Sequence, residues 1–255
     1  MRTPDTALVG AVRASPNFEP RRGGMRPSIL LLHYTGVGSA AGAIDWLSRP
    51  ESKVSAHYVI DEAGKITQLV AEEMRAWHAG LAMWAGESDI NSASIGLEIH
   101  NPGHEAGSPE FPEPQLVVLE ALCRDIIARH GIRPERVLAH SDVAPTRKKD
   151  PGETFPWARL AKRGIGHWVS PEPVNQADPG IARDAAGPLV AEVQSRLAAY
   201  GYGIEATGVC DAKTEFVVTA FQRHFRPERV DGRIDQSTIT TLERLAAALP
   251  KKAHV

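Results

Sequence analysis

The hydrophobic pattern of the first part of the chain predicts short strands. Residues 29–32, Ile-Leu-Leu-Leu, form a continuous apolar run, which is typical of a strand buried on both faces, and His33 follows directly after it. Residues 57–60 and 65–69 flank a short loop that contains glycine, a pattern that predicts a β-hairpin. The first strand is therefore expected to deliver a histidine to its carboxyl end.

Two further strands carry polar side chains at defined positions. In residues 94–100 every second residue is apolar, so Glu98 projects from the face opposite to those apolar side chains. Residues 137–139 form another short apolar run, and His140 follows its end as His33 follows the first run. The pattern thus brings two histidines to strand ends and one carboxylate to a polar sheet face.

Helical periodicity appears between the last two of these strands. Leucine and isoleucine recur at helical spacing between Pro114 and Gly131, and Gly131 is well placed to cap the carboxyl end of that helix. Strands with interspersed helices, without a strict strand–helix–strand repeat, predict an α/β fold class in which helices flank a mixed β-sheet.

A proline-rich segment divides the chain. Residues 168–188 contain four prolines among small and polar residues and show no period, which predicts a linker. The chain beyond it is helical in pattern, with expected helices at residues 189–200, 212–225 and 236–248. We therefore expect an N-terminal extension, a larger α/β domain, a linker and a small all-α three-helix domain, at residues 1–26, 27–168, 169–187 and 188–248.

Composition narrows the possible partners. The 255 residues are 42% hydrophobic and 24% charged, and the formal net charge of -2 disfavours nucleic acid as a partner. No apolar stretch approaches the roughly 20 residues of a membrane span. Cys123 and Cys210 lie far apart and predict buried free thiols. No signal peptide is readable near the first residues, which by sequence predicts a cytoplasmic location.

Candidate chemistry concentrates in residues 139–152, where Asp150 follows His140 by ten residues on a loop interrupted by proline. With His33, these residues offer two imidazoles and one carboxylate. Three protein ligands and one open position are typical of catalytic zinc, which suits amide hydrolysis. Spacing alone leaves the simpler alternative open, because a histidine at a strand end is more often a hydrogen-bonded structural residue.

Four separated motifs, in order along the chain, resemble the type-two family of N-acetylmuramoyl-L-alanine amidases, which are relatives of phage amidase lysozymes and animal peptidoglycan recognition proteins. The motifs are Leu-Leu-His-Tyr-Thr at 31–35, Trp-His-Ala-Gly at 77–80, the segment from Asn91 to Glu98, and residues 140–152. The resemblance covers about residues 27–168.

The resemblance implies a zinc hydrolase that cuts the amide between the muramoyl lactyl group and L-alanine of the peptidoglycan stem peptide. It implies one Zn²⁺ per catalytic domain, with the ligands His33, His140 and Asp150. It assigns Glu98 as the catalytic carboxylate and Lys148 as the catalytic lysine. A carboxylate near the metal can move a proton from water to the leaving amine, and an ammonium can stabilise the oxyanion.

The sequence leaves alternative roles for several residues in and near these motifs. Without the resemblance, Glu98 reads as a solvated strand residue and Lys148 as part of a solvated charged run, in which spacing favours it over Lys149. Trp77, His78 and Arg147 are candidates for substrate binding, although Trp77 also fits the core. His57 fits packing better than ligation. Ala56 occupies the position at which phage relatives have a tyrosine. A mechanism assisted by tyrosine is therefore disfavoured, and Glu98 is favoured as the catalytic group.

The C-terminal segment resembles the three-helix peptidoglycan-binding domain of cell-wall hydrolases, over about residues 188–246. Such a domain is expected to act by tethering the catalytic domain to an insoluble polymer. The expected partner is peptidoglycan or a muropeptide, and a monomer is favoured. The alternatives are a non-catalytic peptidoglycan-recognition protein and a zinc peptidase that acts within the stem peptide. A binding domain also allows a periplasmic or wall-associated location.

Overall fold

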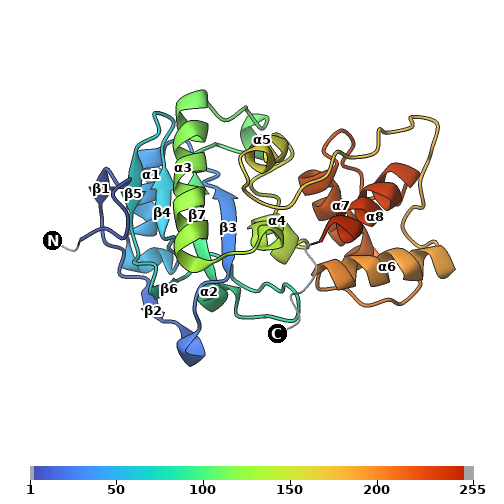
Figure 1. Ribbon diagram of the computed structural model, residues 1–255, viewed down its shortest axis with the longest axis horizontal. Coiled ribbons are helices and arrows are strands. Elements are labelled where there is room, and N and C mark those ends of the chain that lie inside the picture. The colour runs from blue at the N-terminus through green and yellow to red at the C-terminus, as the bar shows by residue number, and fades with distance from the viewer. Residues whose placement is uncertain (1–2, 250–255) are drawn as a thin grey trace.

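The structure is a computed structural model in which residues 3–249 are described, and it shows a layered α/β body in contact with a helical bundle (Figure 1). The strands are β1 (Ala11–Val12), β2 (Phe18–Pro20), β3 (Ile29–Tyr34), β4 (Tyr58–Ile60), β5 (Ile66–Gln68), β6 (Met74–Ala76), β7 (Ser94–Ile99) and β8 (Val137–Ala139). The α-helices are α1 (Ala40–Leu47), α2 (Ile90–Ala93), α3 (Glu113–His130), α4 (His140–Val143), α5 (Trp157–Lys162), α6 (Pro188–Tyr200), α7 (Ala212–Phe225) and α8 (Gln236–Ala248).

The central sheet is mixed and has the strand order β1-β5-β4-β7-β3-β8. Strand β3 pairs in parallel with β7 and β8, and β4 pairs in parallel with β7. The neighbouring pair β4 and β5 is antiparallel, which confirms the predicted hairpin. The fold class predicted from sequence, a mixed sheet flanked by helices, is confirmed.

Strand β3 is longer than the apolar run predicts. It spans Ile29–Tyr34, so the expectation that His33 lies after the strand is wrong. The ladder continues because β7 runs opposite this part of β3 and pairs His33 with Glu98 and Tyr34 with Ile99. His33 and Glu98 therefore lie side by side on neighbouring strands.

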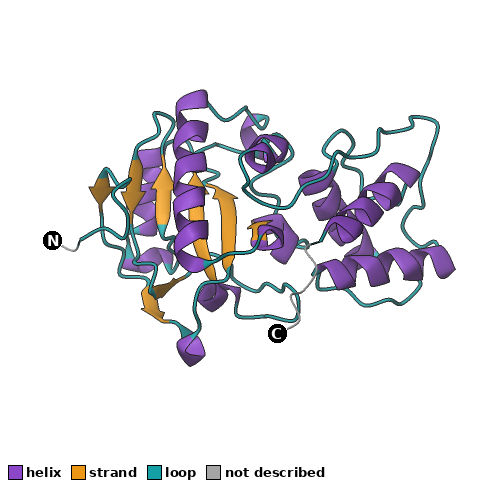
Figure 2. Cartoon of the chain, viewed as in Figure 1, coloured by secondary structure: helices purple, strands orange, loops and turns teal. Residues whose placement is uncertain are grey.

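Burial on both faces explains the continuous apolar run of β3. Leu30 and Leu32 belong to the apolar cluster under α3, whereas Ile29 and Leu31 belong to a cluster that continues through α4 into the bundle. Helix α1 covers the face of the sheet opposite α3, where its Leu47 belongs to the same apolar cluster as Val59 of β4 (Figure 2). The sheet thus lies between helices on both sides.

The residues that precede β3 pack against the α/β body. Strand β1 pairs with β5 at the edge of the sheet, and β2 pairs with β6 in a separate two-stranded ribbon. The buried guanidinium of Arg21 donates hydrogen bonds to the backbone carbonyls of Glu72, Ser92 and Ser94. Part of the range 1–26 therefore contributes strands and hydrogen bonds to this body.

The bundle consists of α6, α7 and α8, which match the three helices predicted from the periodicity. Asp211 caps α7 and Asp235 caps α8, each by accepting a backbone N–H of the first turn. The segment predicted as a linker runs along the bundle, where Ile181 pairs with Ile234 in an isolated bridge. This segment is therefore held by the bundle, at the connection between α7 and α8.

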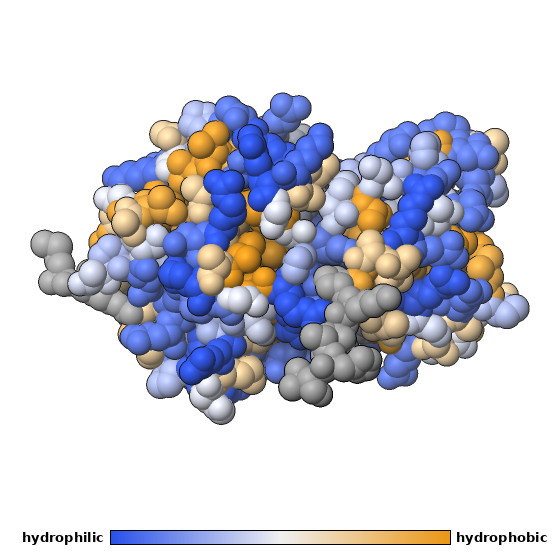
Figure 3. Space-filling view, viewed as in Figure 1, coloured by the Kyte–Doolittle hydropathy of each residue, from blue (hydrophilic) through white to orange (hydrophobic). Residues whose placement is uncertain are grey.

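Hydrophilic residues cover most of the molecular face seen in Figure 3. None of the helices within residues 3–249 has the length and apolar character that crossing a membrane requires. In the same residues, Cys123 and Cys210 are buried free cysteines, as predicted.

Candidate metal centre and active-site cleft

Parallel pairing brings the predicted ligands to the end of the sheet at which β3 and β8 have their carboxyl ends. His33 lies near the carboxyl end of β3, and His140 begins α4 immediately after β8, whose Ala139 pairs with Leu32 of β3. Asp150 follows on the loop after α4, where its carbonyl accepts a hydrogen bond from the Ser141 N–H at 3.0 Å. All three candidate ligands are buried.

The three side chains converge on one point. His33 Nδ1 and His140 Nδ1 are 2.9 Å apart, and Asp150 Oδ2 lies 3.1 Å from the former and 2.9 Å from the latter. A tetrahedral zinc with bonds of about 2.0–2.1 Å separates its ligand atoms by roughly 3.3 Å, close to these values. The cluster therefore has the residue types and spacing of a site that could hold a metal ion.

Electrostatics also suits a cation. Burial, and the positive charge that His140 can carry, lower the pKa of His33 to about 4, so this imidazole is neutral at pH 7. Burial opposes ionisation of Asp150, but the adjacent His140 and His33 hold its pKa well below the usual range. Neutral imidazole and carboxylate are the ligand forms that zinc requires.

A second layer of hydrogen bonds orients the ligands. His140 Nε2 is 3.1 Å from the carbonyl of Ala79, and His33 Nε2 is 3.0 Å from His78 Nδ1. Because Nδ1 of each histidine points to the place where the three ligand atoms converge, Nε2 carries the proton. His140 Nε2 then donates to the Ala79 carbonyl and His33 Nε2 donates to His78 Nδ1. His78 Nε2 in turn lies 3.3 Å from Ser94 Oγ. His78 thus lies on the floor of the cleft as a partner of His33.

Glu98 supplies a carboxyl group next to the cluster. Its side chain is partly exposed, but Oε2 is enclosed and has no hydrogen-bond partner among the described residues. Burial, together with the negative charge of Asp150, raises the pKa of Glu98 to about 8. A carboxyl group that exchanges its proton near neutral pH suits general acid–base chemistry.

These residues line a cleft of about 520 Å³. Lys148 is half-buried in its wall, whereas Lys149 is exposed. Arg147 lies at the rim and donates hydrogen bonds to the carbonyls of Ala79 and Leu81. Trp77 lines the cleft as well, and its indole Nε1 is buried without a partner in residues 3–249.

Sequence reasoning missed some residues that line the cleft. Tyr34 and His104 face it, and Tyr34 Oη lies 3.0 Å from His104 Nδ1. His104 comes from a loop without a periodic pattern, so no signal in the sequence assigned it a place. His57, interpreted as a packing residue, is buried, and its Nδ1 accepts the N–H of Gly96 at 3.0 Å.

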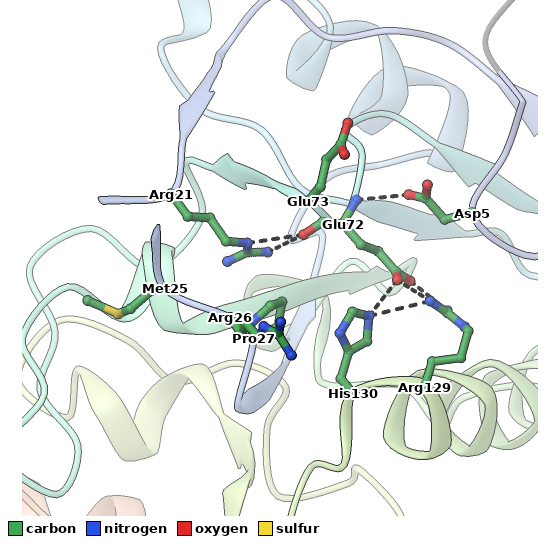
Figure 4. Close-up of a pocket in the computed structure, with 9 residues that line it drawn as sticks. All are labelled: Asp5, Arg21, Met25, Arg26, Pro27, Glu72, Glu73, Arg129 and His130. Carbon is green, nitrogen blue, oxygen red and sulfur yellow. Dashed lines mark hydrogen bonds and ion pairs between the residues drawn. The ribbon is translucent and has the colours of Figure 1, made fainter. Parts of the chain in front are cut away.

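A second cavity, of about 530 Å³, lies at the other end of β7 (Figure 4). Several of its charged groups are paired with one another: Glu72 accepts hydrogen bonds from Arg129 and lies 2.7 Å from His130 Nε2. The Arg21 guanidinium donates to the Glu72 carbonyl. This cavity shares no lining residue with the catalytic cleft.

Together the fold and the side-chain cluster define a hydrolase of amide bonds built around a three-residue site that could hold a metal. The chain belongs to the N-acetylmuramoyl-L-alanine amidase family, whose sequence model matches residues 23–153. The model of a peptidoglycan binding domain matches residues 186–242. The resemblance described from the sequence motifs is thereby confirmed.

Similar proteins match one or both domains. The N-acetylmuramoyl-L-alanine amidase AmiD of Escherichia coli is 37% identical over 86% of this chain and 82% of its own length. A structure of AmiD with anhydro-N-acetylmuramic acid-L-Ala-D-γ-Glu-L-Lys has a TM-score of 0.75 at 34% identity and covers 93% of both chains. Pseudomonas aeruginosa AmpDh3, in complex with an anhydromuramic pentapeptide, has a TM-score of 0.73 at 30% identity and covers 98% of this chain and all of its own.

The 1,6-anhydro-N-acetylmuramyl-L-alanine amidase AmpD of Escherichia coli is a shorter relative. It is 32% identical over 60% of this chain and 91% of its own length. AmiD thus matches this chain along most of its length, whereas AmpD matches a part of it.

Proposed function

We propose that the protein binds one Zn²⁺ through His33, His140 and Asp150 and hydrolyses the amide between N-acetylmuramic acid, or its anhydro form, and L-alanine of the stem peptide. The convergence of three ligand atoms beside the enclosed carboxyl of Glu98 is the observation that carries this proposal. When bound, zinc polarises the scissile carbonyl and lowers the pKa of the attacking water to about 7.

The residues of this chain move the proton and stabilise charge. Glu98 takes a proton from the attacking water and passes it to the leaving amide nitrogen, a role supported by its raised pKa and by its place beside His33. Lys148 stabilises the developing oxyanion with its ammonium group, a role supported by its position in the cleft wall.

The remaining cleft residues bind the substrate. Trp77 lines the cleft and offers its aromatic ring as a packing surface for the muropeptide. Arg147 holds the loop of Ala79 and Leu81 and offers the rest of its guanidinium to a peptide carboxylate. His78 contributes to binding through the cleft floor and through the orientation of His33.

The solved relatives support a muropeptide as the substrate, because both contain an anhydromuramic peptide. We propose that the range 27–168 holds the catalytic domain and that 188–248 retains it on peptidoglycan, joined by 169–187 and preceded by the extension 1–26. The peptidoglycan binding domain supports association with the cell wall. A purely recognising protein is disfavoured, because all three ligands and Glu98 are present together.

Digestion of purified muropeptides tests the reaction. The zinc-loaded protein is expected to release free stem peptide with an L-alanine amino terminus, together with the sugar that lacks peptide. Mass spectrometry of the products distinguishes cleavage of the amide between muramic acid and L-alanine from cleavage of a peptide bond within the stem peptide. Cleavage at an internal peptide bond without release of L-alanine-terminated peptide would identify a zinc peptidase instead, and binding without any cleavage would identify a recognition protein.

A further inference from the structure

A fully buried carboxylate lies two residues after the candidate ligand His140. Asp142 belongs to α4, and its Oδ2 accepts a hydrogen bond from the Ala139 N–H at 2.8 Å, which fixes the turn where His140 begins. A buried carboxylate requires several donors, because each one that is missing costs free energy. The source of its other donors therefore affects how firmly His140 is held.

Two of these donors come from the C-terminal domain. The Tyr202 hydroxyl donates to Asp142 Oδ1 at 2.7 Å, and His224 Nδ1 donates to Asp142 Oδ2 at 2.6 Å. The His224 ring is buried and stacks on Trp157 of α5, with ring centroids 3.7 Å apart, and on Phe225. Packing thus locks the imidazole that holds Asp142.

The preceding residue of α7 reaches the other end of the same stretch, residues 140–153, which we call the metal-binding segment. Arg223 Nε donates to Glu153 Oε2 at 3.1 Å, three residues beyond the last candidate ligand. The same Glu153 oxygen is 3.0 Å from His104 Nε2, and His104 contacts Tyr34 in the cleft. The neighbours Arg223 and His224 therefore hold both ends of the metal-binding segment.

A third contact involves the loop of residues 79–84, which begins within the Trp-His-Ala-Gly motif. The Ala79 carbonyl lies 3.1 Å from His140 Nε2, and Trp84 is buried against Tyr202, with ring centroids 4.9 Å apart. A Cβ added at Gly201 would lie 2.5 Å from the Trp84 indole, so the two domains approach each other closely here. Figure 1 shows α4 between the sheet and the bundle.

We propose that Tyr202, Arg223 and His224 are positioning residues for the metal-binding segment, so that the C-terminal domain forms part of the amidase centre and is more than a tether. This inference rests on the proposed function, since it concerns how the proposed zinc ligands are held. None of the three side chains lines the catalytic cleft, so they act through Asp142 and Glu153. Shorter relatives such as AmpD match only 60% of this chain, so this arrangement belongs to the two-domain protein.

The test compares full-length variants in which the donors to Asp142 are removed or retained. The double variant Tyr202→Phe/His224→Phe removes both donors to Asp142 and retains aromatic rings. His224→Asn retains a nitrogen donor near the Nδ1 position and serves as the conservative rescue. Asp211→Ala is the matched control, because it removes the exposed cap of α7 and lies far along the helix from His224. The readouts are zinc affinity by chelator competition and the visible spectrum of the Co²⁺-substituted protein.

We expect the double variant to bind zinc about 10-fold more weakly, the lower end of the effect of losing a direct partner of a metal ligand, because Asp142 acts through the turn that carries His140. Its Co²⁺ spectrum should change, whereas His224→Asn and Asp211→Ala should keep the affinity and spectrum of the wild type. Tyr202→Phe alone is the milder variant should the double variant fail to fold, and it should show a smaller change in the same direction. Unchanged affinity and spectrum in a folded variant that lacks these donors would overturn the inference while leaving the proposed function intact. A wild-type protein that binds no zinc would overturn both.

Discussion

The neighbouring groups give the two carboxylates of the cleft opposite pKa shifts. Asp150 is ionised because His140 and His33 lie against it, whereas Oε2 of Glu98 is enclosed without a hydrogen-bond partner among the described residues and this carboxyl holds a proton more tightly. Two carboxylates with separated pKa values can take separate roles, one as a ligand and one as the group that exchanges protons. The roles follow from the surroundings of each side chain.

Replacement of Glu98 by glutamine should lower turnover by on the order of 10² or more, because the side chain keeps its size but loses the exchangeable proton. Zinc content should stay at one ion per chain, since Glu98 is outside the ligand set. Steady-state kinetics and metal analysis of the same preparation measure both quantities. Loss of the metal together with activity would make Glu98 a structural residue.

The raised pKa of Glu98 also predicts a pH dependence of stability in the metal-free protein. Between the ordinary value of 4.5 and the folded value of about 8, the folded state binds the proton that the unfolded state has lost. The contribution of Glu98 to stability is therefore present below this window and decreases as the pH rises through it. The melting temperature of Glu98→Gln should fall less over this window than that of the wild type, and parallel curves would contradict the shift.

At the scale of elements, β7 has a glycine, Gly96, at a position where the His78 ring leaves no room for a side chain. A Cβ at Gly96 would lie 2.5 Å from His78 Nδ1, and His78 in turn contacts His33. Gly96→Ala should displace His78, at a cost of about 1–3 kcal/mol in stability, and should weaken zinc binding. Chemical denaturation and chelator competition measure these effects. Gly38→Ala, at a site with open space around it, is the control, and equal behaviour of the two variants would refute this explanation.

The sequence predicts which strands and helices carry the site more accurately than it predicts the residues at which they begin and end. Apolar runs and helical spacing predict the strands and helices, because these patterns reflect burial. They do not reveal that β3 continues to Tyr34, since this extension depends on pairing with β7, a segment distant in sequence. Similarly, no periodic signal connects Asp142 with Tyr202 and His224, because these contacts form only when the two domains pack.

At the scale of the whole molecule, one apolar cluster runs from β3 through α4 into the bundle, so the elements that carry the proposed zinc ligands share a core with the C-terminal domain. A ligand that binds only the folded state stabilises it by mass action, by about 2.7 kcal/mol at 100 times its dissociation constant. Removal of zinc should therefore lower the melting temperature and abolish hydrolysis, and added zinc should restore both. Calorimetry of the stripped and reloaded protein measures the shift; an unchanged melting temperature and full activity after stripping would contradict a zinc centre.

The most direct measurement is a crystal structure of the zinc-loaded protein, with anomalous scattering recorded at the zinc edge. We predict one anomalous peak bonded to His33 Nδ1, His140 Nδ1 and a carboxylate oxygen of Asp150, with a solvent molecule in the fourth position facing Glu98. A peak at other residues, a fourth protein ligand that closes the site, or the absence of an ion among these three side chains would contradict it.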